Sequence, residues 1–169
     1  IIEANAETIL EEIGIEFRRD PESLRLWRGA GADVNGERVR IPRGMARSLL
    51  ATAPREFELH ARNPARNIWL GGDATVFSPV GGPPFVTDLD RGRRYGTLED
   101  LHNFVKLVHA APAIHFSSVG IVEPMDIPPG KRHLDVQYAS FRYSDQGCEG
   151  TPETPGHAAD AVRMAQVLF

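Results

Sequence analysis

The spacing of apolar residues divides the chain into three stretches. Up to about residue 55, apolar side chains recur three and four positions apart, which is typical of amphipathic helices. Between residues 57 and 95 the period falls to two, and glycine and proline separate short runs, which predicts antiparallel hairpins. From residue 97 onward helical patterns alternate with short apolar runs, and this order predicts strand–helix units.

The first stretch predicts three short helices and one hairpin. The first helix has one apolar face, made of Ile2, Ala6, Ile9 and Ile13. Asp20 and Pro21 are an N-cap residue followed by proline at the first helical position, so a second helix begins there. Asn35-Gly36 is a strong hairpin signal, and Pro42 opens a third helix.

The middle stretch predicts short strands joined by tight turns. The candidate strands cover residues 56–60, 67–70, 75–77, 85–88 and 93–95. Their connections are too short for parallel crossovers, so we expect antiparallel pairing.

The last stretch predicts two strand–helix units after an amphipathic helix. That helix begins at Thr97, whose spacing from Asp100 resembles a capping box, and it stops at Pro112. We then expect a buried strand over residues 114–119, a break at Gly120 and a helix from about 131 to 142. A second strand over 146–151 and a helix from about residue 155 complete the pattern.

These elements predict an α/β protein in two parts. Residues 1–112 would form an N-terminal extension of helices and hairpins, and residues 113–169 would begin a parallel α/β architecture. Two parallel strands do not make an ordinary sheet. We therefore expect the chain to be a fragment of a longer polypeptide.

Composition narrows the class of protein. The net charge of −4 argues against a nucleic-acid partner or an anionic membrane. The sequence has no apolar run long enough to span a bilayer. Cys148 is the only cysteine, which excludes an internal disulfide and a thiolate metal cage. We expect a cytoplasmic protein with no metal site.

Several segments resemble the trimethylamine methyltransferase-like family of corrinoid-dependent methyltransferases. The resemblance keeps its order along nearly the whole chain and covers the N-terminal portion of a family member. It is carried by His60–Pro64, Pro83–Val86, Asp88–Arg94, Thr97–Asp100, Val122–Pro124, Asp126–Pro128, Lys131–Asp135 and Tyr143–Asp145.

The resemblance implies a (β/α)₈ barrel of the TIM type, here truncated after its first units. It implies transfer of a methyl group from a tertiary or quaternary methylated amine to the Co(I) of a corrinoid carried by a partner protein. The chain itself would bind no cofactor directly, the isolated fragment would be inactive, and the full-length parent would be a homo-oligomer. Some family members contain pyrrolysine beyond this stretch, and others act on glycine betaine without it.

Candidate substrate-binding residues follow from the position of the barrel loops. Barrel enzymes place their chemistry at the carboxyl ends of the strands, where Gly120 and Glu123 follow the first predicted strand and Glu149 ends the second. Glu123 is the best carboxylate for a methylated ammonium group. His115 lies within the first strand and can point into the barrel. No catalytic residue is assigned, since the nucleophile belongs to the corrinoid.

Each candidate also has a purely structural interpretation. Glu123 can pair with Arg132, and His115 can be a hydrogen-bonded core histidine. Cys148 suits a small core residue better than a nucleophile, because no activating base is evident. The sequence after Asp145, Gln146–Gly150, departs from the apolar strand usual in the family. The alternative function is a non-enzymatic α+β module that binds other proteins.

Overall fold

A computed structural model describes residues 1–118, 120–150 and 153–169. The chain forms two compact units, Ile1–Arg55 and Glu56–Phe169, and each is described by itself. The boundary predicted near residue 112 separates an N-terminal extension from the start of a barrel. It does not coincide with the division between these compact units and stays a prediction.

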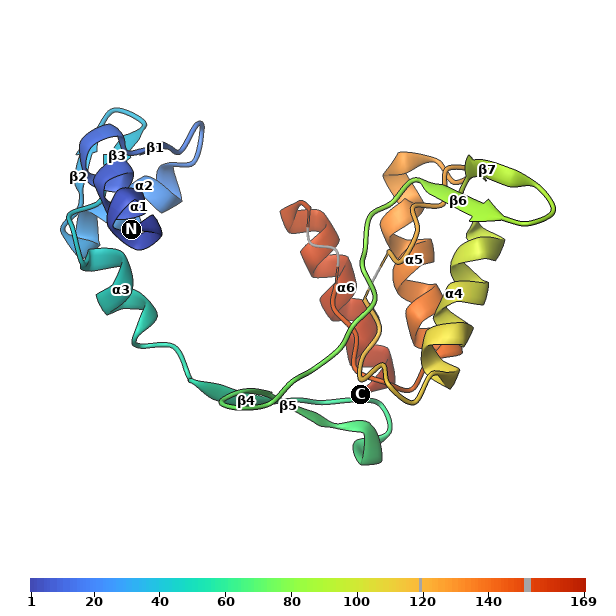
Figure 1. The fold of residues 1–169 in the computed structure, drawn as a ribbon. Helices are drawn as coiled ribbons and strands as arrows, with labels where there is room; N and C mark the ends of the chain where they lie inside the picture. Colours follow the sequence, from blue (N-terminus) through green and yellow to red (C-terminus); the bar gives the residue numbers. More distant parts are fainter. Residues whose placement is uncertain (119, 151–152) are drawn as a thin grey trace. The chain divides into compact units, whose positions relative to one another are not determined.

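The first unit is a small three-stranded antiparallel sheet with short helices (Figure 1). Its strand order is β1-β3-β2. Its elements are α1 (Ile2–Thr8), a π-helical turn η1 (Ile9–Ile13), β1 (Ile15–Glu16), α2 (Pro21–Ala30), β2 (Asp33–Asn35), β3 (Arg38–Arg40) and α3 (Met45–Leu50).

Local signals in the sequence account for these boundaries. The Asp20 carboxylate accepts a hydrogen bond of 3.0 Å from the Ser23 amide and so caps α2, as predicted. Gly31 ends the helix in the left-handed conformation. Val39 of β3 is fully buried and forms the core of this unit with Ala32 and Ile41. The predicted hairpin at Asn35-Gly36 is confirmed.

The second unit combines two antiparallel hairpins with three helices. Its elements are β4 (Glu56–Leu59), a 3₁₀ turn η2 (Pro64–Arg66), β5 (Ile68–Gly71), β6 (Phe85–Asp88), β7 (Gly92–Tyr95), α4 (Leu98–Ala110), α5 (Pro129–Tyr143) and α6 (Pro155–Leu168). β4 pairs with β5 and β6 with β7, both antiparallel, as predicted. The strand predicted at residues 75–77 is wrong: among the described residues this segment has no neighbouring strand, and the Phe77 backbone pairs there with His115.

The central strand prediction also needs correction. Residues 114–118 and 146–150 form no regular strands, and Val119 and Thr151 lie outside the described residues. The two segments meet at one parallel bridge between Ser117 and Cys148, where the Ser117 amide donates to the Gly147 carbonyl at 2.9 Å. A parallel pair without further neighbours is weak, which explains why no ladder extends from the bridge within the described parts of these two segments.

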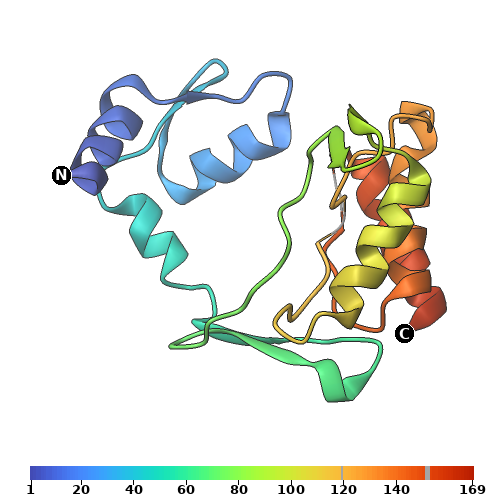
Figure 2. The same cartoon turned by 45° about the vertical axis from the view of Figure 1, so that its right-hand side comes forward.

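The three helices of this unit lie side by side, with α5 between α4 and α6 (Figures 1 and 2). The core beneath them consists of Val86, Leu101, Val105, Ile121, Val122, Val136 and Ala139. Mixed helices and small antiparallel sheets are consistent with the predicted α/β class. None of the helices in the described ranges combines the length and the apolar character needed to cross a membrane.

The loop of residues 120–126 is fixed by backbone hydrogen bonds to two earlier segments. The Glu123 amide donates to the Pro83 carbonyl at 3.0 Å, and the Met125 amide donates to the Gly96 carbonyl at 2.9 Å. The Asp126 carboxylate accepts from the Leu98 amide at 2.9 Å, at the start of α4. Glu123 therefore projects from a backbone that is held on both sides.

Gly96 allows this loop to approach β7 closely. A Cβ atom at position 96 would lie 2.4 Å from Val122 Cγ2 and 3.0 Å from the Glu123 carbonyl oxygen. We expect Gly96→Ala to lower the free energy of unfolding by about 1–3 kcal/mol, because the buried loop must move to admit the methyl group. Urea denaturation measures this.

Gly130→Ala is the matched control for this prediction. Gly130 lies in the first turn of α5, and a Cβ atom there meets nothing within 4 Å. Alanine favours a helix over glycine, so this variant should be neutral or slightly more stable. Equal stability of the two variants would show that the 120–126 loop does not rest on Gly96.

Candidate functional site

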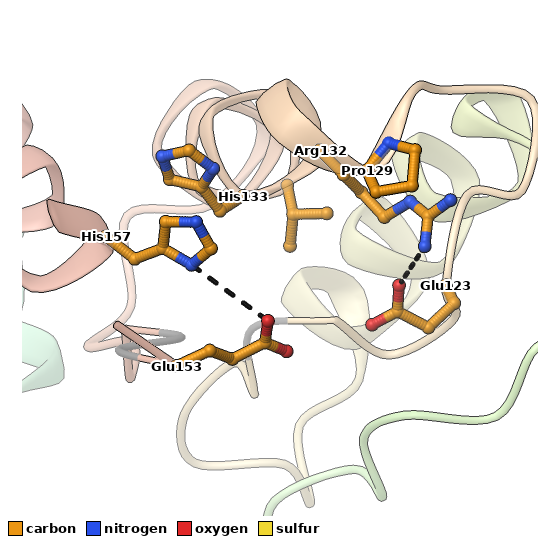
Figure 3. Close-up of a pocket in the computed structure, with 7 residues that line it drawn as sticks. Glu123, Pro129, Arg132, His133, Glu153 and His157 are labelled. Carbon is orange, nitrogen blue, oxygen red and sulfur yellow. Dashed lines mark hydrogen bonds and ion pairs between the residues drawn. The ribbon is translucent and has the colours of Figure 1, made fainter. Parts of the chain in front are cut away.

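A small polar cavity lies where α5 and α6 begin and where the 120–126 loop passes them (Figure 3). Its volume is about 90 Å³, enough for several water molecules or one small organic headgroup. The residues that line it are Glu123, Pro129, Arg132, His133, Val136, Glu153 and His157. We call this the α5–α6 pocket.

Arg132 and Glu123 form one side of the pocket. Arg132 Nη1 donates to Glu123 Oε2 at 3.2 Å, and Nη2 donates to the Ile127 carbonyl at 3.0 Å. The Arg132 side chain is 19% exposed and that of Glu123 is 31% exposed, so water screens the pair only in part. This contact confirms the structural partner considered for Glu123, and it leaves Oε1 available on the side of the cavity (Figure 3).

His157 and Glu153 form the opposite side. The hydroxyl of Thr154 caps α6 by accepting from the His157 amide at 3.1 Å, which fixes the first turn of that helix. His157 Nδ1 lies 4.0 Å from Glu153 Oε2, and the Glu153 side chain is 76% exposed. The Glu153 carboxylate therefore reaches toward the cavity from a well-hydrated position.

A stacked pair of imidazoles joins α5 to α6 at the pocket. The rings of His133 and His157 have centroids 3.8 Å apart and planes inclined by 15°. His133 Nε2 lies 3.0 Å from Asp160 Oδ2, which orients the His133 ring from the second turn of α6. The pocket is thus built from two helices whose relative position is fixed by side chains of the pocket itself.

Three buried nitrogen atoms in this pocket have no hydrogen-bond partner among the described residues. They are Arg132 Nε, His133 Nδ1 and His157 Nδ1. A buried charged donor without an acceptor costs more than about 1 kcal/mol. Within the described residues, the two terminal nitrogens of Arg132 have hydrogen-bond acceptors and its Nε–H has none.

His115 does not line the α5–α6 pocket. Its Nδ1 accepts a hydrogen bond of 2.9 Å from the Phe77 amide, and its own amide donates to the Phe77 carbonyl at 2.9 Å. The ring also stacks on Phe77 with a centroid distance of 5.9 Å. These contacts match the structural interpretation of His115, and its role in binding substrate stays a prediction.

Gly120 and Glu149 also lie outside the lining of the pocket. Gly120 has a φ of +79°, which favours glycine, and its carbonyl accepts from the Gly82 amide at 2.7 Å. A Cβ atom there would lie 3.9 Å from Glu123 Oε1, so Gly120 borders Glu123. Glu149 is exposed, and its contact with substrate stays a prediction.

Cys148 is a partly buried thiol that packs against the core of this unit. Burial raises its pKa to about 11, and a hydrogen bond of 3.6 Å from Gln137 Nε2 offsets the shift only in part. We expect alkylation by iodoacetamide at pH 8 to be at least tenfold slower in the folded chain than in urea, since the thiolate is the reactive form.

The same shift predicts how Cys148 affects stability. The neutral form of this partly buried thiol stabilises the fold below its unfolded pKa, and this contribution falls as the pH rises from about 9 toward 11. Cys148→Ser should weaken that alkaline loss. Equal alkylation rates in the folded and unfolded states would show an accessible, reactive thiol instead.

Sequence reasoning did not identify Glu153 and His157 as site residues. Both lie about 30 residues beyond Glu123, and no motif links them to it. The available signal was Thr154-Pro155, an N-cap and first-position proline that fix the start of α6. If the two predicted strand–helix units run parallel, the start of α6 must lie near the start of α5.

A concave site with a few convergent charged groups, at the start of two neighbouring helices, is typical of small-molecule sites in α/β proteins. Comparison with known proteins identifies the family to which the chain belongs. The model of the family Trimethylamine methyltransferase (MTTB) matches residues 1–169, and the chain belongs to this family.

The chain is also similar to two curated proteins. The chain is 46% identical over 168 residues to the glycine betaine methyltransferase of Desulfitobacterium hafniense (strain Y51), covering 99% of this chain and 35% of that protein. It is 28% identical over 131 residues to the L-carnitine:corrinoid methyltransferase of Eubacterium limosum, covering 78% of this chain and 26% of that protein. The chain thus spans about a third or less of the length of these relatives.

Proposed function

We propose that this chain is the N-terminal part of a corrinoid-dependent methyltransferase that demethylates a quaternary methylated amine. The observation that carries the proposal is the 46% identity, over almost the whole chain, to a glycine betaine methyltransferase. The second relative is named as a corrinoid methyltransferase, which supports a corrinoid protein as the methyl acceptor. A (β/α)₈ barrel continuing beyond the Ser117–Cys148 bridge is part of the proposal.

This reaction requires the protein to position the substrate and does not require acid–base catalysis. A corrinoid carried by a partner protein would supply the Co(I) nucleophile for the methyl group. The C–N bond of a quaternary ammonium breaks with both electrons staying on nitrogen, so the product is a neutral amine and no proton is needed. The pocket must hold the ammonium group and exclude water around it.

Glu123 suits the role of holding the cation. Its backbone is fixed by one hydrogen bond to Pro83 and by Pro124, which restricts the residue before it to an extended conformation. One carboxylate oxygen pairs with Arg132, and the other faces the cavity (Figure 3). Attraction to a poorly hydrated ammonium then orients the substrate by its charged end.

The experiment measures methyl transfer by the full-length protein to a reduced corrinoid protein. The readout is the change in absorbance when Co(I) is methylated. We expect methylation with glycine betaine as the donor. The 169-residue chain alone should give none, since it covers 35% of the length of that relative. Failure of the full-length protein with every quaternary and tertiary methylamine would overturn the proposed function.

A further inference from the structure

The α5–α6 pocket contains charges of both signs, and this decides which ligand fits it. Arg132 carries a positive charge, while Glu123 and Glu153 each carry a negative charge. A simple anion would meet two carboxylates, and a simple cation would meet the guanidinium. A ligand with a cation at one end and a carboxylate at the other meets an opposite charge at each end.

We propose that the α5–α6 pocket binds a zwitterionic quaternary amine. Arg132 binds the carboxylate of this ligand, and Glu123 and Glu153 bind its ammonium group. This inference rests on the proposed function and deepens it, because it assigns the residue that selects carboxylate-bearing substrates.

The hydrogen bonds of Arg132 support its part in this assignment. Its two terminal nitrogens are used within the protein, by Glu123 and by the Ile127 carbonyl. Its Nε–H is buried and has no acceptor among the described residues. A ligand carboxylate supplies the missing acceptor and a charge-assisted hydrogen bond, which is among the stronger kinds.

The start of α5 adds to the positive field around Arg132. α5 has 15 residues and α6 has 14, and the first turn of each lines the pocket. The N-terminal end of a helix carries partial positive charge and favours an anion. The end of α5 therefore favours the carboxylate of the ligand on the side where Arg132 lies.

Glu153 completes the site on the cation side. It faces the pocket from the residue before the N-cap of α6, across from Glu123 (Figure 3). Its side chain is largely exposed and lies no closer than 4.0 Å to His157 Nδ1, so it can turn toward a bound ammonium without breaking a short contact to that ring. An ammonium group between Glu123 and Glu153 would leave the carboxylate of the ligand to contact Arg132, which lies beside Glu123.

The test compares glycine betaine with choline, which has the same trimethylammonium group and a hydroxyl instead of the carboxylate. Calorimetric titration of the wild-type full-length protein should show at least tenfold tighter binding of glycine betaine. Arg132→Gln should weaken glycine betaine at least tenfold and choline less than twofold. Arg132→Lys keeps the charge and should fall between the two for glycine betaine.

Arg142→Gln is the matched control, because Arg142 is an exposed arginine of the same helix. It should leave both affinities unchanged. Equal affinity of the wild type for the two ligands would overturn the inference even if no Arg132 variant folds. Equal weakening of both ligands by Arg132→Gln would also overturn it, by showing a merely structural role. Either result, with methyl transfer to the corrinoid intact, would leave the proposed function standing.

Discussion

Replacing Asp100 with asparagine should lower the free energy of unfolding of the unit Glu56–Phe169 by about 3 kcal/mol. Arg94 donates two parallel hydrogen bonds to the Asp100 carboxylate, at 2.5 and 2.7 Å. The same carboxylate accepts from the Thr97 amide at 2.9 Å and completes the capping box of α4. The Asp100 and Arg94 side chains are only 12% and 20% exposed, so breaking the pair leaves a partly buried guanidinium.

The pH dependence gives this prediction a second readout. The hydrogen bonds from Arg94 hold the pKa of Asp100 well below its usual range, despite the opposing effect of burial. Because the folded pKa is lower than the unfolded one, the carboxylate stabilises the fold above a pH of about 4 and loses this effect as the pH falls further. The difference between wild type and Asp100→Asn should therefore shrink in acid.

Urea denaturation of this chain followed by circular dichroism measures the effect, with Asp90→Asn as the control. Asp90 is an exposed carboxylate at the tip of the β6–β7 hairpin, so its loss should change the stability by less than about 0.5 kcal/mol. A loss at Asp100 no larger than at Asp90, or a loss that does not depend on pH, would contradict the role given to the Arg94–Asp100 pair.

Glu123→Gln in the full-length protein should raise the KM for a quaternary amine at least tenfold, equal to about 1.4 kcal/mol of binding. The amide keeps the shape of the side chain and an oxygen that can accept from Arg132, so the melting temperature should stay nearly constant. The lost interaction is the attraction between a carboxylate and the ammonium group of the substrate. Steady-state kinetics of corrinoid methylation measure KM and kcat separately.

Glu99→Gln serves as the control for this variant. Glu99 is an exposed acid in the first turn of α4, and its loss removes the same charge away from the pocket. A fall in melting temperature at Glu123→Gln with an unchanged KM would mean that the ion pair with Arg132 is the whole role of Glu123. That outcome would remove Glu123 from the substrate site.

The parts of the fold that were predictable from sequence are those set by local chemistry. Asp20-Pro21 and Thr97 with Asp100 began helices as expected, because caps act within one helical turn. The strands expected at 75–77, 114–119 and 146–151 depended on distant partners. A strand needs a neighbour to form a ladder, and Ser117 and Cys148 form only one bridge in the described residues.

The candidate site divides in the same way. Glu123 and its partner Arg132 could be named from sequence, because they are nine residues apart on either side of a proline-rich turn. Glu153 and His157 could not, since they reach the pocket through the packing of α6 against α5. The stacking of His133 on His157 depends on that packing and leaves no signal in the spacing of residues.

The position of a bound substrate tests the central claim most directly. We expect a crystal structure of the full-length protein with glycine betaine to show the ligand in the α5–α6 pocket. Its trimethylammonium group should contact the carboxylates of Glu123 and Glu153, and its carboxylate should lie within hydrogen-bond distance of Arg132. Glycine betaine bound elsewhere, with the Glu123–Arg132 pair unchanged and the pocket filled by other parts of the protein, would contradict the claim.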